Sequence, residues 1–154
     1  MLQSITEKLA ALGLNLPAAA EAKGNYLPYT ISGNLLSLSG TLPIKQGALI
    51  AGRIGGDLSV EQGYEAARWC FLNALAHIRV ATDDFRRFGR VLHIDGFVNG
   101  VDGFADAPKV VNGASDLSVE LFGDAGKHSR VALSSNGLPL NAAVETRVLV
   151  ELDA

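Results

Sequence analysis

The clearest pattern along the chain is a helical stripe of apolar residues between positions 59 and 81. Its members recur at steps of three or four, which places them on one face of a helix: Tyr64, Ala67, Phe71, Leu75 and Ile78. Ser59 followed three residues later by Gln62 forms a capping box, a sequence signature of a helix start. The pattern therefore predicts a long helix that ends in the turn TDDFRRFGR.

Two further helices are predicted from weaker signals. A short one covers residues 3–13 and is closed by Gly13 and Pro17. Another follows Asp106 and Pro108, two residues favoured at helix starts, and its apolar stripe is Val110, Ala114, Leu117 and Leu121. Gly113 lies inside this helix, where glycine costs about 1 kcal/mol relative to alanine. We therefore expect a local reason for a glycine at this position.

The remaining apolar segments alternate with a period of two, which predicts strands. YTIS and LLSLSG flank Gly33-Asn34 as a hairpin, and RVLHIDGFV, SRVALSS and AAVETRVLVEL follow later. In the last of these, five residues share an apolar face: Val144, Thr146, Val148, Val150 and Leu152. The order of elements predicts an α+β fold with two main helices packed on one face of a mixed sheet. The second face of the sheet would need cover, so we expect the chain to associate.

Composition narrows the possible functions. The chain has 154 residues, 48% hydrophobic and 19% charged, which fits one domain with a core of its own. A net charge of -3 without a basic block argues against a nucleic-acid surface. No stretch is apolar enough to predict a membrane span, and the N-terminus lacks the pattern of a signal peptide. We therefore expect a cytoplasmic protein.

Most candidate catalytic or metal-binding residues have a plain structural interpretation. His77, His93 and His128 lack a further ligand at metal-binding spacing, so no metal site is predicted. His77 and His93 are expected to be partly buried side chains with satisfied hydrogen bonds. Cys70 has no cation near it in sequence and is expected to pack in the core. No serine lies in a nucleophile elbow, so a Ser-His-Asp triad is not predicted.

Arg130 and Glu145 are the exceptions, because each is a charged residue in an otherwise apolar strand. If the two strands are adjacent, the side chains can approach each other. One interpretation is a cross-strand ion pair worth about 0.2–1 kcal/mol. The other is a guanidinium that binds an anion beside a carboxylate that handles a proton. The pattern alone leaves both interpretations open.

Four segments resemble the YjgF/RidA family, also known as endoribonuclease L-PSP. SGNLLSLSGTLP resembles its hairpin, KGNY its Gly-Pro-Tyr lead-in, and GFVNGVDGFADAPKVVN its central segment. SRVALSSNGLPLNAAVETRVLVEL resembles its closing signature, with eight positions from Arg130 to Leu138 and six from Pro139 to Glu145. The resemblance covers residues 23–152. Residues 1–154 would then form a single RidA-like domain, with residues 1–17 as an N-terminal helical extension.

The resemblance implies a chorismate-mutase-like fold and a homotrimer in which the sheets line the inside and ligand clefts lie between subunits. It also implies hydrolysis of reactive 2-imino acids or their enamine tautomers, such as 2-aminoacrylate, to 2-keto acids and ammonia. No metal or organic cofactor is implied. The ligand would be a small metabolite that carries a carboxylate, with no nucleic-acid or membrane partner.

The same resemblance implies roles for five residues. Arg130 would bind the substrate carboxylate, Glu145 would hold and activate the attacking water, and three residues would line the cleft: Tyr26, Ser39 and Asn112. Tyr29 is a rival to Tyr26. Gly113, next to Asn112, would allow the backbone to approach a ligand or a neighbouring chain closely. Ala132 stands where the family often has cysteine, and Thr41 where it usually has glutamine.

Two other functions remain as alternatives. The first is a non-catalytic module that binds keto or amino acids through Arg130, which the replacement of the family cysteine by Ala132 motivates. The second is an RNA-cleaving translation inhibitor, against which the acidic balance of the chain argues.

Overall fold

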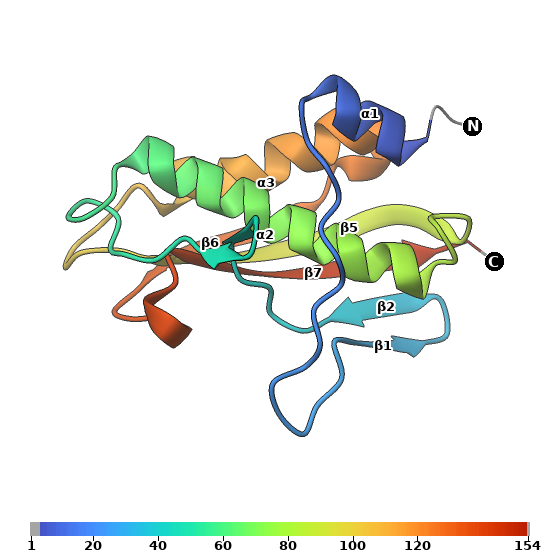
Figure 1. Cartoon of the computed structure of the whole chain (residues 1–154), viewed down its shortest axis with the longest axis horizontal. Helices are drawn as coiled ribbons and strands as arrows, with labels where there is room; N and C mark the ends of the chain where they lie inside the picture. The colour runs from blue at the N-terminus through green and yellow to red at the C-terminus, as the bar shows by residue number, and fades with distance from the viewer. Residues whose placement is uncertain (1–3, 154) are drawn as a thin grey trace.

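A computed structural model describes residues 4–153, in which a five-stranded sheet is covered on one face by two long helices (Figure 1). The strand order is β1-β2-β7-β5-β6. The elements are α1 (Ile5–Ala11), β1 (Tyr29–Ser32), β2 (Leu35–Leu38), β3 (Ile44–Lys45), β4 (Ala48–Leu49), α2 (Val60–Ala81), β5 (Phe88–Asn99), α3 (Ala107–Phe122), β6 (Ser129–Ser135) and β7 (Val144–Leu152), with short 3₁₀ turns η1 (Gly123–Gly126) and η2 (Pro139–Asn141).

The helix predictions are confirmed, apart from small differences at the ends. Ser59 and Gln62 form both hydrogen bonds of the capping box that begins α2. Asp106 precedes α3, but its side chain makes no capping hydrogen bond. The N-terminal helix α1 begins after Ser4, and residue 3 of the predicted range lies outside the described residues. Within residues 4–153 no helix combines the length and apolar character needed to cross a membrane.

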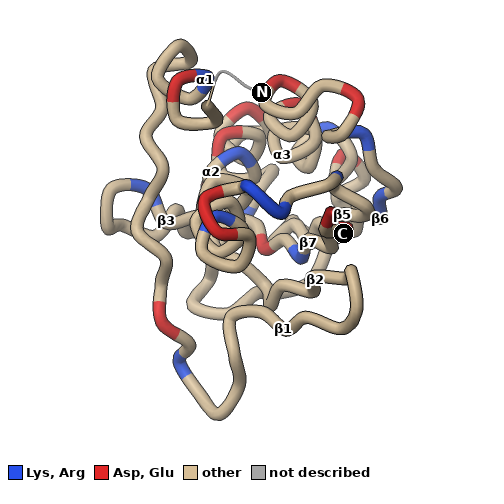
Figure 2. Tube along the Cα trace, turned by 90° about the vertical axis from the view of Figure 1, so that its right-hand side faces the viewer, with Lys and Arg blue, Asp and Glu red and all other residues tan. Residues whose placement is uncertain are grey.

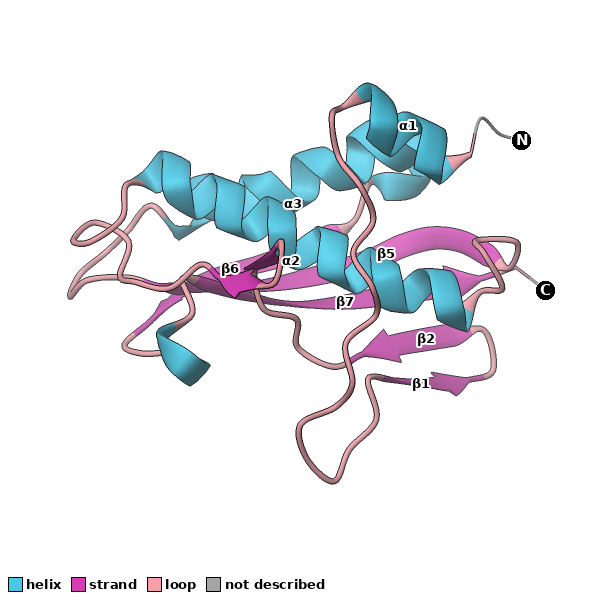
Figure 3. Ribbon diagram, viewed as in Figure 1, coloured by secondary structure: helices cyan, strands magenta, loops and turns pink. Residues whose placement is uncertain are grey.

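The strand β7 shows why alternation in sequence determines the two faces of the sheet. Val144, Thr146 and Val148 are fully buried under the helices, whereas Glu145 and Arg147 point to the opposite, open face. The predicted α+β architecture, with two main helices on one face of a mixed sheet, is therefore confirmed (Figure 3).

The last two strands of the chain, β6 and β7, are not neighbours in the sheet. β5 lies between β6 and β7, pairing in parallel with β6 and antiparallel with β7. The physical reason is the helix α3, which connects β5 to β6 as a crossover of the kind that parallel neighbours require. β6 thereby becomes an edge strand, and its Val131 and Leu133 lie exposed on the open face.

The close approach predicted at Gly113 exists, but it lies within the chain. A Cβ atom at this position would collide with the main-chain carbonyl of Tyr64 on α2. Gly113 therefore allows α2 and α3 to pack closely, and contact with a ligand or another chain is not the reason for it. The cost of glycine in the helix is offset by burial of the apolar side chains that line the two helices.

The segment between α1 and β1, residues 12–28, crosses the outer side of α2 as an irregular strap (Figures 1 and 3). Leu14 and Leu16 pack against the core and fix its first half. The second half carries one acidic and one basic residue, Glu21 and Lys23 (Figure 2). The strap thus becomes a wall beside α2 that the pattern of helices and strands does not predict.

Replacing Gly113 by alanine should destabilise the protein, although alanine is the better helix former. The added methyl group has no space against the Tyr64 carbonyl, and overpacking of this kind costs about 1–3 kcal/mol. The free energy of unfolding in urea measures the effect. Val119→Ala, on the exposed side of the same helix, is the control and should change it by less. Equal or higher stability of Gly113→Ala would contradict the packing argument.

Candidate functional site

Arg130 extends from the edge strand β6 along α3 and is held by uncharged groups. Its Nη1 atom donates hydrogen bonds to Oδ1 of Asn112 at 2.7 Å and to Oγ of Ser115 at 3.2 Å. Within residues 4–153 no carboxylate forms an ion pair with its guanidinium. The half-buried side chain is therefore oriented while its positive charge remains uncompensated, which suits an anionic ligand.

His128 fixes the orientation of the serine that supports Arg130. Its Nδ1 lies 2.7 Å from the carbonyl oxygen of Gly126, and its Nε2 lies 2.9 Å from Oγ of Ser115. Burial, assisted by the charge of Arg130, lowers the pKa of His128, so the ring is neutral near pH 7. Because a carbonyl only accepts, the ring proton lies on Nδ1, and Nε2 accepts the Ser115 hydroxyl. The Ser115 oxygen is then free to accept the hydrogen bond from Arg130.

Glu145 is the other charged residue that sequence singled out, and it is also without a counterion. It is half-buried on the open face of β7, and burial raises the pKa of its carboxyl group. Its carboxylate lies directly against Gly40, where a Cβ atom would collide with it. Within the described part of the chain it makes no salt bridge. A raised pKa makes this carboxylate a stronger base than an exposed one.

Arg130 and Glu145 do not meet within one chain, so the cross-strand ion pair is wrong. Arg130 is in register with Ile94 of β5, which faces the helices, whereas Glu145 is in register with Phe97 on the open face. The two side chains therefore lie on opposite faces of the sheet, with a whole strand between their own strands. The cross-strand ion pair that does form joins Arg147 of β7 to Asp95 of β5 at 3.2 Å.

Tyr26 and Ser39 lie together, away from Arg130, in the wall of a cavity of about 210 Å³. Ser39 donates a 2.6 Å hydrogen bond to the carbonyl oxygen of Leu27, and the exposed Tyr26 accepts a weak one from the Lys23 amide. Tyr29 packs against the core instead, so of the two tyrosines Tyr26 is the one that lines the cavity. Asn112 lies with Arg130, not with Tyr26 and Ser39.

The five residues thus fall into two groups within one protomer. Arg130 and Asn112 belong to the edge formed by β6 and α3, which we call the arginine edge. Tyr26 and Ser39 line the cavity to which Gly40 also contributes, Glu145 lies against Gly40, and we call these three residues the glutamate edge. Sequence reasoning missed Ser115 and His128. The only signal for them is that Ser115 lies three residues after Asn112, on the same side of the helix.

The other titratable residues agree only in part with expectation. Cys70 is buried, and burial raises the pKa of its thiol, as expected for a packing residue. His93 bonds to Ser129 and Asp95 and is satisfied as expected. His77 is buried as well, and no hydrogen bond joins its ring to another of the described residues.

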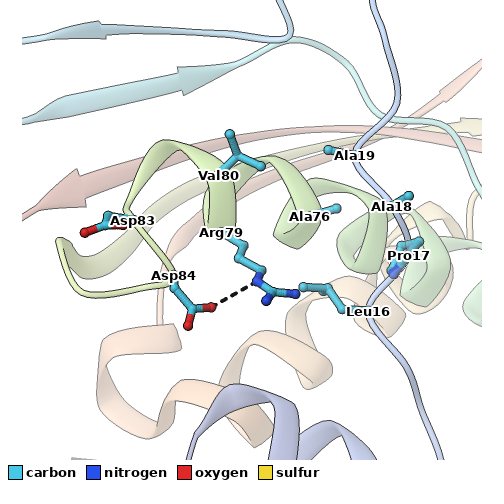
Figure 4. Close-up of a pocket in the computed structure, with 9 residues that line it drawn as sticks. All are labelled: Leu16, Pro17, Ala18, Ala19, Ala76, Arg79, Val80, Asp83 and Asp84. Carbon is cyan, nitrogen blue, oxygen red and sulfur yellow. Dashed lines mark hydrogen bonds and ion pairs between the residues drawn. The ribbon is translucent and has the colours of Figure 1, made fainter.

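A further hollow lies between the first half of the strap and the end of α2 (Figure 4). Its only cationic residue, Arg79, is paired with Asp84 at 2.9 Å, so it offers no free charge to a ligand. Within residues 4–153 no three His, Cys, Asp or Glu side chains are gathered as a metal site would require.

Stability should fall as the pH decreases from 8 towards 6. Burial lowers the pKa of His77 and of His128 below the ordinary value of 6.5, so the unfolded chain binds more protons than the folded protein in this interval. Urea unfolding at the two pH values measures the loss. The double variant His77→Leu/His128→Gln should show a smaller loss. An identical pH dependence in the variant would contradict the assignment to these two histidines.

The chain is similar to a protein family and to individual proteins of known sequence or structure. The family model described as "YjgF/chorismate mutase-like, putative endoribonuclease" matches residues 6–152. Protein TCP17 from Trypanosoma cruzi is 40% identical over 151 residues, covering 97% of this chain and 94% of TCP17. The crystal structure of Atu1372 from Agrobacterium tumefaciens, described as of unknown function, is 40% identical with a TM-score of 0.90, covering 97% of this chain and 92% of that one.

Two more crystal structures extend the comparison. A protein from Shewanella oneidensis, described as a putative endoribonuclease, is 38% identical to this chain with a TM-score of 0.93. The match covers 97% of this chain and 100% of the other. TdcF from E. coli, solved with bound serine, is 18% identical with a TM-score of 0.63, covering 86% and 92%. At that identity TdcF shows a common fold only. The match of the family model to nearly every described residue shows that the chain belongs to the YjgF/chorismate mutase-like family, also called RidA.

Proposed function

We propose that the protein hydrolyses reactive 2-imino acids, or their enamine tautomers, to 2-keto acids and ammonia. The observation that carries the proposal is the Arg130 guanidinium, which neutral oxygens orient and no carboxylate of the described chain neutralises. An arginine kept in this state has the planar donor geometry that binds a carboxylate through two parallel hydrogen bonds. The relative TdcF, solved with bound serine, is an example of a family member that holds a small carboxylate-bearing molecule.

Glu145 would supply the proton transfers that hydrolysis needs. An iminium carbon is already electrophilic, so the reaction requires an oriented water molecule and a base. Glu145 removes a proton from the water as its oxygen bonds to C2, giving a tetrahedral aminoalcohol. The protonated Glu145 then returns that proton to the nitrogen, the C–N bond breaks, and the hydroxyl proton leaves as the keto group forms. Iminium and water thus become a 2-keto acid and ammonium, and the carboxylate is regenerated.

We further propose that the complete site forms between copies of the chain, in a homotrimer. The arginine edge of one protomer would face the glutamate edge of the next, a heterologous contact that closes into a ring. Two observations support this assembly. Arg130 and Glu145 each lack an opposite charge within the described chain, and the open sheet face exposes apolar side chains that include Val131 and Leu133.

A binding module without turnover is the second candidate, because Ala132 occupies the position beside Arg130 on the same face of β6 where the family often has cysteine. Such a module would use the arginine edge in the same way. Calorimetric binding of 2-ketobutyrate, with no acceleration of imine decay above buffer, would favour this candidate over the deaminase.

Variants of the two charged residues test the deaminase directly. Arg130→Ala should raise KM for 2-aminoacrylate by about 10–100-fold, because a charge-assisted contact worth about 1.5–3 kcal/mol is lost. Glu145→Gln keeps the shape and should lower kcat by about 10²–10⁴-fold, because the base is lost. Keto-acid and ammonia release is measured while a dehydratase generates the substrate.

Arg86→Ala is the matched control, since Arg86 is an exposed arginine of a turn that pairs only with Asp83. It should behave as wild type. A wild-type protein no faster than buffer, or an Arg130→Ala variant as fast as wild type, would refute the proposal.

Mixed oligomers test whether the site lies between chains. Arg130→Ala and Glu145→Gln chains, each strongly impaired alone at a substrate concentration below KM, should regain about one quarter of wild-type activity when co-assembled at equal amounts. The reason is that half of the clefts contain an intact arginine and, independently, half contain an intact glutamate. Activity of the whole co-assembled mixture, homotrimers included, measures the recovery. No recovery from an oligomer shown to contain both chains would place the two residues in separate roles.

A further inference from the structure

Arg53 is a second arginine whose side chain is held by uncharged oxygens. Its Nη2 atom donates hydrogen bonds to the main-chain carbonyl oxygen of Gly100 and, at 3.1 Å, to Oδ1 of Asn136. An arginine side chain has five N–H groups, and these two bonds use two of them. Within residues 4–153 its buried Nε atom has no hydrogen-bond partner, and its Nη1 atom makes no hydrogen bond either. The chain therefore orients this guanidinium without satisfying it.

The carboxylates around Arg53 compensate its charge weakly. Oδ1 of Asp102 is 4.0 Å from Nη2, which is too long for a hydrogen bond, and the Asp102 side chain is 96% exposed. An ion pair in such a position is worth little, because water screens it. The carboxylate of Asp57 accepts a hydrogen bond from the main-chain amide of Arg53 and is thereby bound to the backbone. Much of the positive charge thus remains available to a ligand.

A hollow of about 480 Å³ opens beside this guanidinium, at the carboxyl ends of β5 and β6. The two strands are parallel neighbours connected by α3, and in sheets of this kind ligands bind in the crevice outside the carboxyl ends of the strands. The loops that precede α2 and α3 meet there, at one end of the molecule (Figure 1). Arg130 lies near the beginning of β6 and does not line the hollow, which is therefore separate from the arginine edge.

The lining of the hollow combines hydrogen-bond donors with apolar side chains. Asn136 accepts from Arg53 through Oδ1, which leaves its amide group as a donor. The Ser134 hydroxyl lies against Gly100, in space that a Cβ atom there would need. The wall also includes the side chains of Val101 and Phe104. A ligand in the hollow would thus meet a charged donor, two neutral donors and an apolar surface.

We propose that this hollow binds a small organic acid that carries one carboxylate on an apolar body. The carboxylate would accept hydrogen bonds from Nη1 of Arg53 and from the hydroxyl of Ser134, while the apolar body packs against Phe104. Since no residue of the hollow belongs to the arginine edge or the glutamate edge, this site is independent of the proposed reaction.

The charges around the hollow favour a carboxylate over a phosphate. Arg53 provides one positive charge, and Asp102 at the rim repels a dianion more strongly than a monoanion. At about 30 Å³ for each water-sized group, the hollow has space for roughly sixteen such groups, which exceeds the needs of an inorganic anion. An aromatic or branched-chain acid fits both the space and the apolar wall.

The test is calorimetric titration of phenylacetate into the Arg130→Ala variant, which removes the guanidinium of the other site. We expect one phenylacetate to bind per chain. Phenylacetamide, which has a similar shape but no charge, should not bind, and equimolar inorganic phosphate should not displace phenylacetate. Adding Arg53→Gln should weaken binding by about tenfold or more, because a charge-assisted hydrogen bond is lost. Adding Arg86→Gln, at the exposed arginine that pairs with Asp83, is the control and should not change the affinity.

A second substitution predicts a gain and keeps the test decisive if Arg53→Gln does not fold. Asp102→Asn removes the competing carboxylate and should strengthen phenylacetate binding by about two- to fivefold. Asp124→Asn is the matched control, because Asp124 is 95% exposed and lies beyond the other end of α3. It should leave the affinity unchanged.

Four results would overturn the proposal. They are no binding of phenylacetate to the folded Arg130→Ala variant, equal affinity after a folded Arg53→Gln substitution, no difference between Asp102→Asn and Asp124→Asn, and displacement by phosphate or equal binding of phenylacetamide. Because the titrations measure binding in a variant without Arg130, none of these results depends on whether the protein is a deaminase.

Discussion

The candidate site depends on one guanidinium that is oriented entirely by uncharged groups. Asn112 and Ser115 hold Arg130 in place, and His128 determines which way the Ser115 hydroxyl points. A carboxylate could also orient the Arg130 guanidinium, but it would neutralise the positive charge that attracts an anionic ligand. The neutral imidazole of His128 matters for the same reason, because a second positive charge beside Arg130 would repel it.

The pleat of the sheet imposes a second constraint, since successive residues along a strand point to opposite faces. Arg130 faces the helices and Glu145 faces away from them, so a single chain separates the two charges that hydrolysis would combine. Charges that are partly buried and unpaired are unfavourable for an isolated domain. The proposed association of identical chains would relieve this cost and would cover the apolar side chains of the open face in the same step.

Much of the fold follows from the sequence, since short-range rules determine it. The capping box at Ser59 and the alternation along 144–152 place α2 and the faces of β7 correctly. The pairing of β6 with β5 could also be predicted from the sequence, because a helix that connects two strands favours their parallel pairing as neighbours in the sheet. Gly113, the Ser115–His128 contact and the separation of Arg130 from Glu145 depend on how elements pack, which periodicity does not specify.

The strap, residues 12–28, is the part of the fold that the periodicity of apolar residues in the sequence does not predict. Residues 18–22 read as a loop of small residues, and they have no regular secondary structure in the fold. The effect of these residues follows from their position: alanines held against α2 by Leu14 and Leu16 add little bulk, so space remains beside Asn73 and His77.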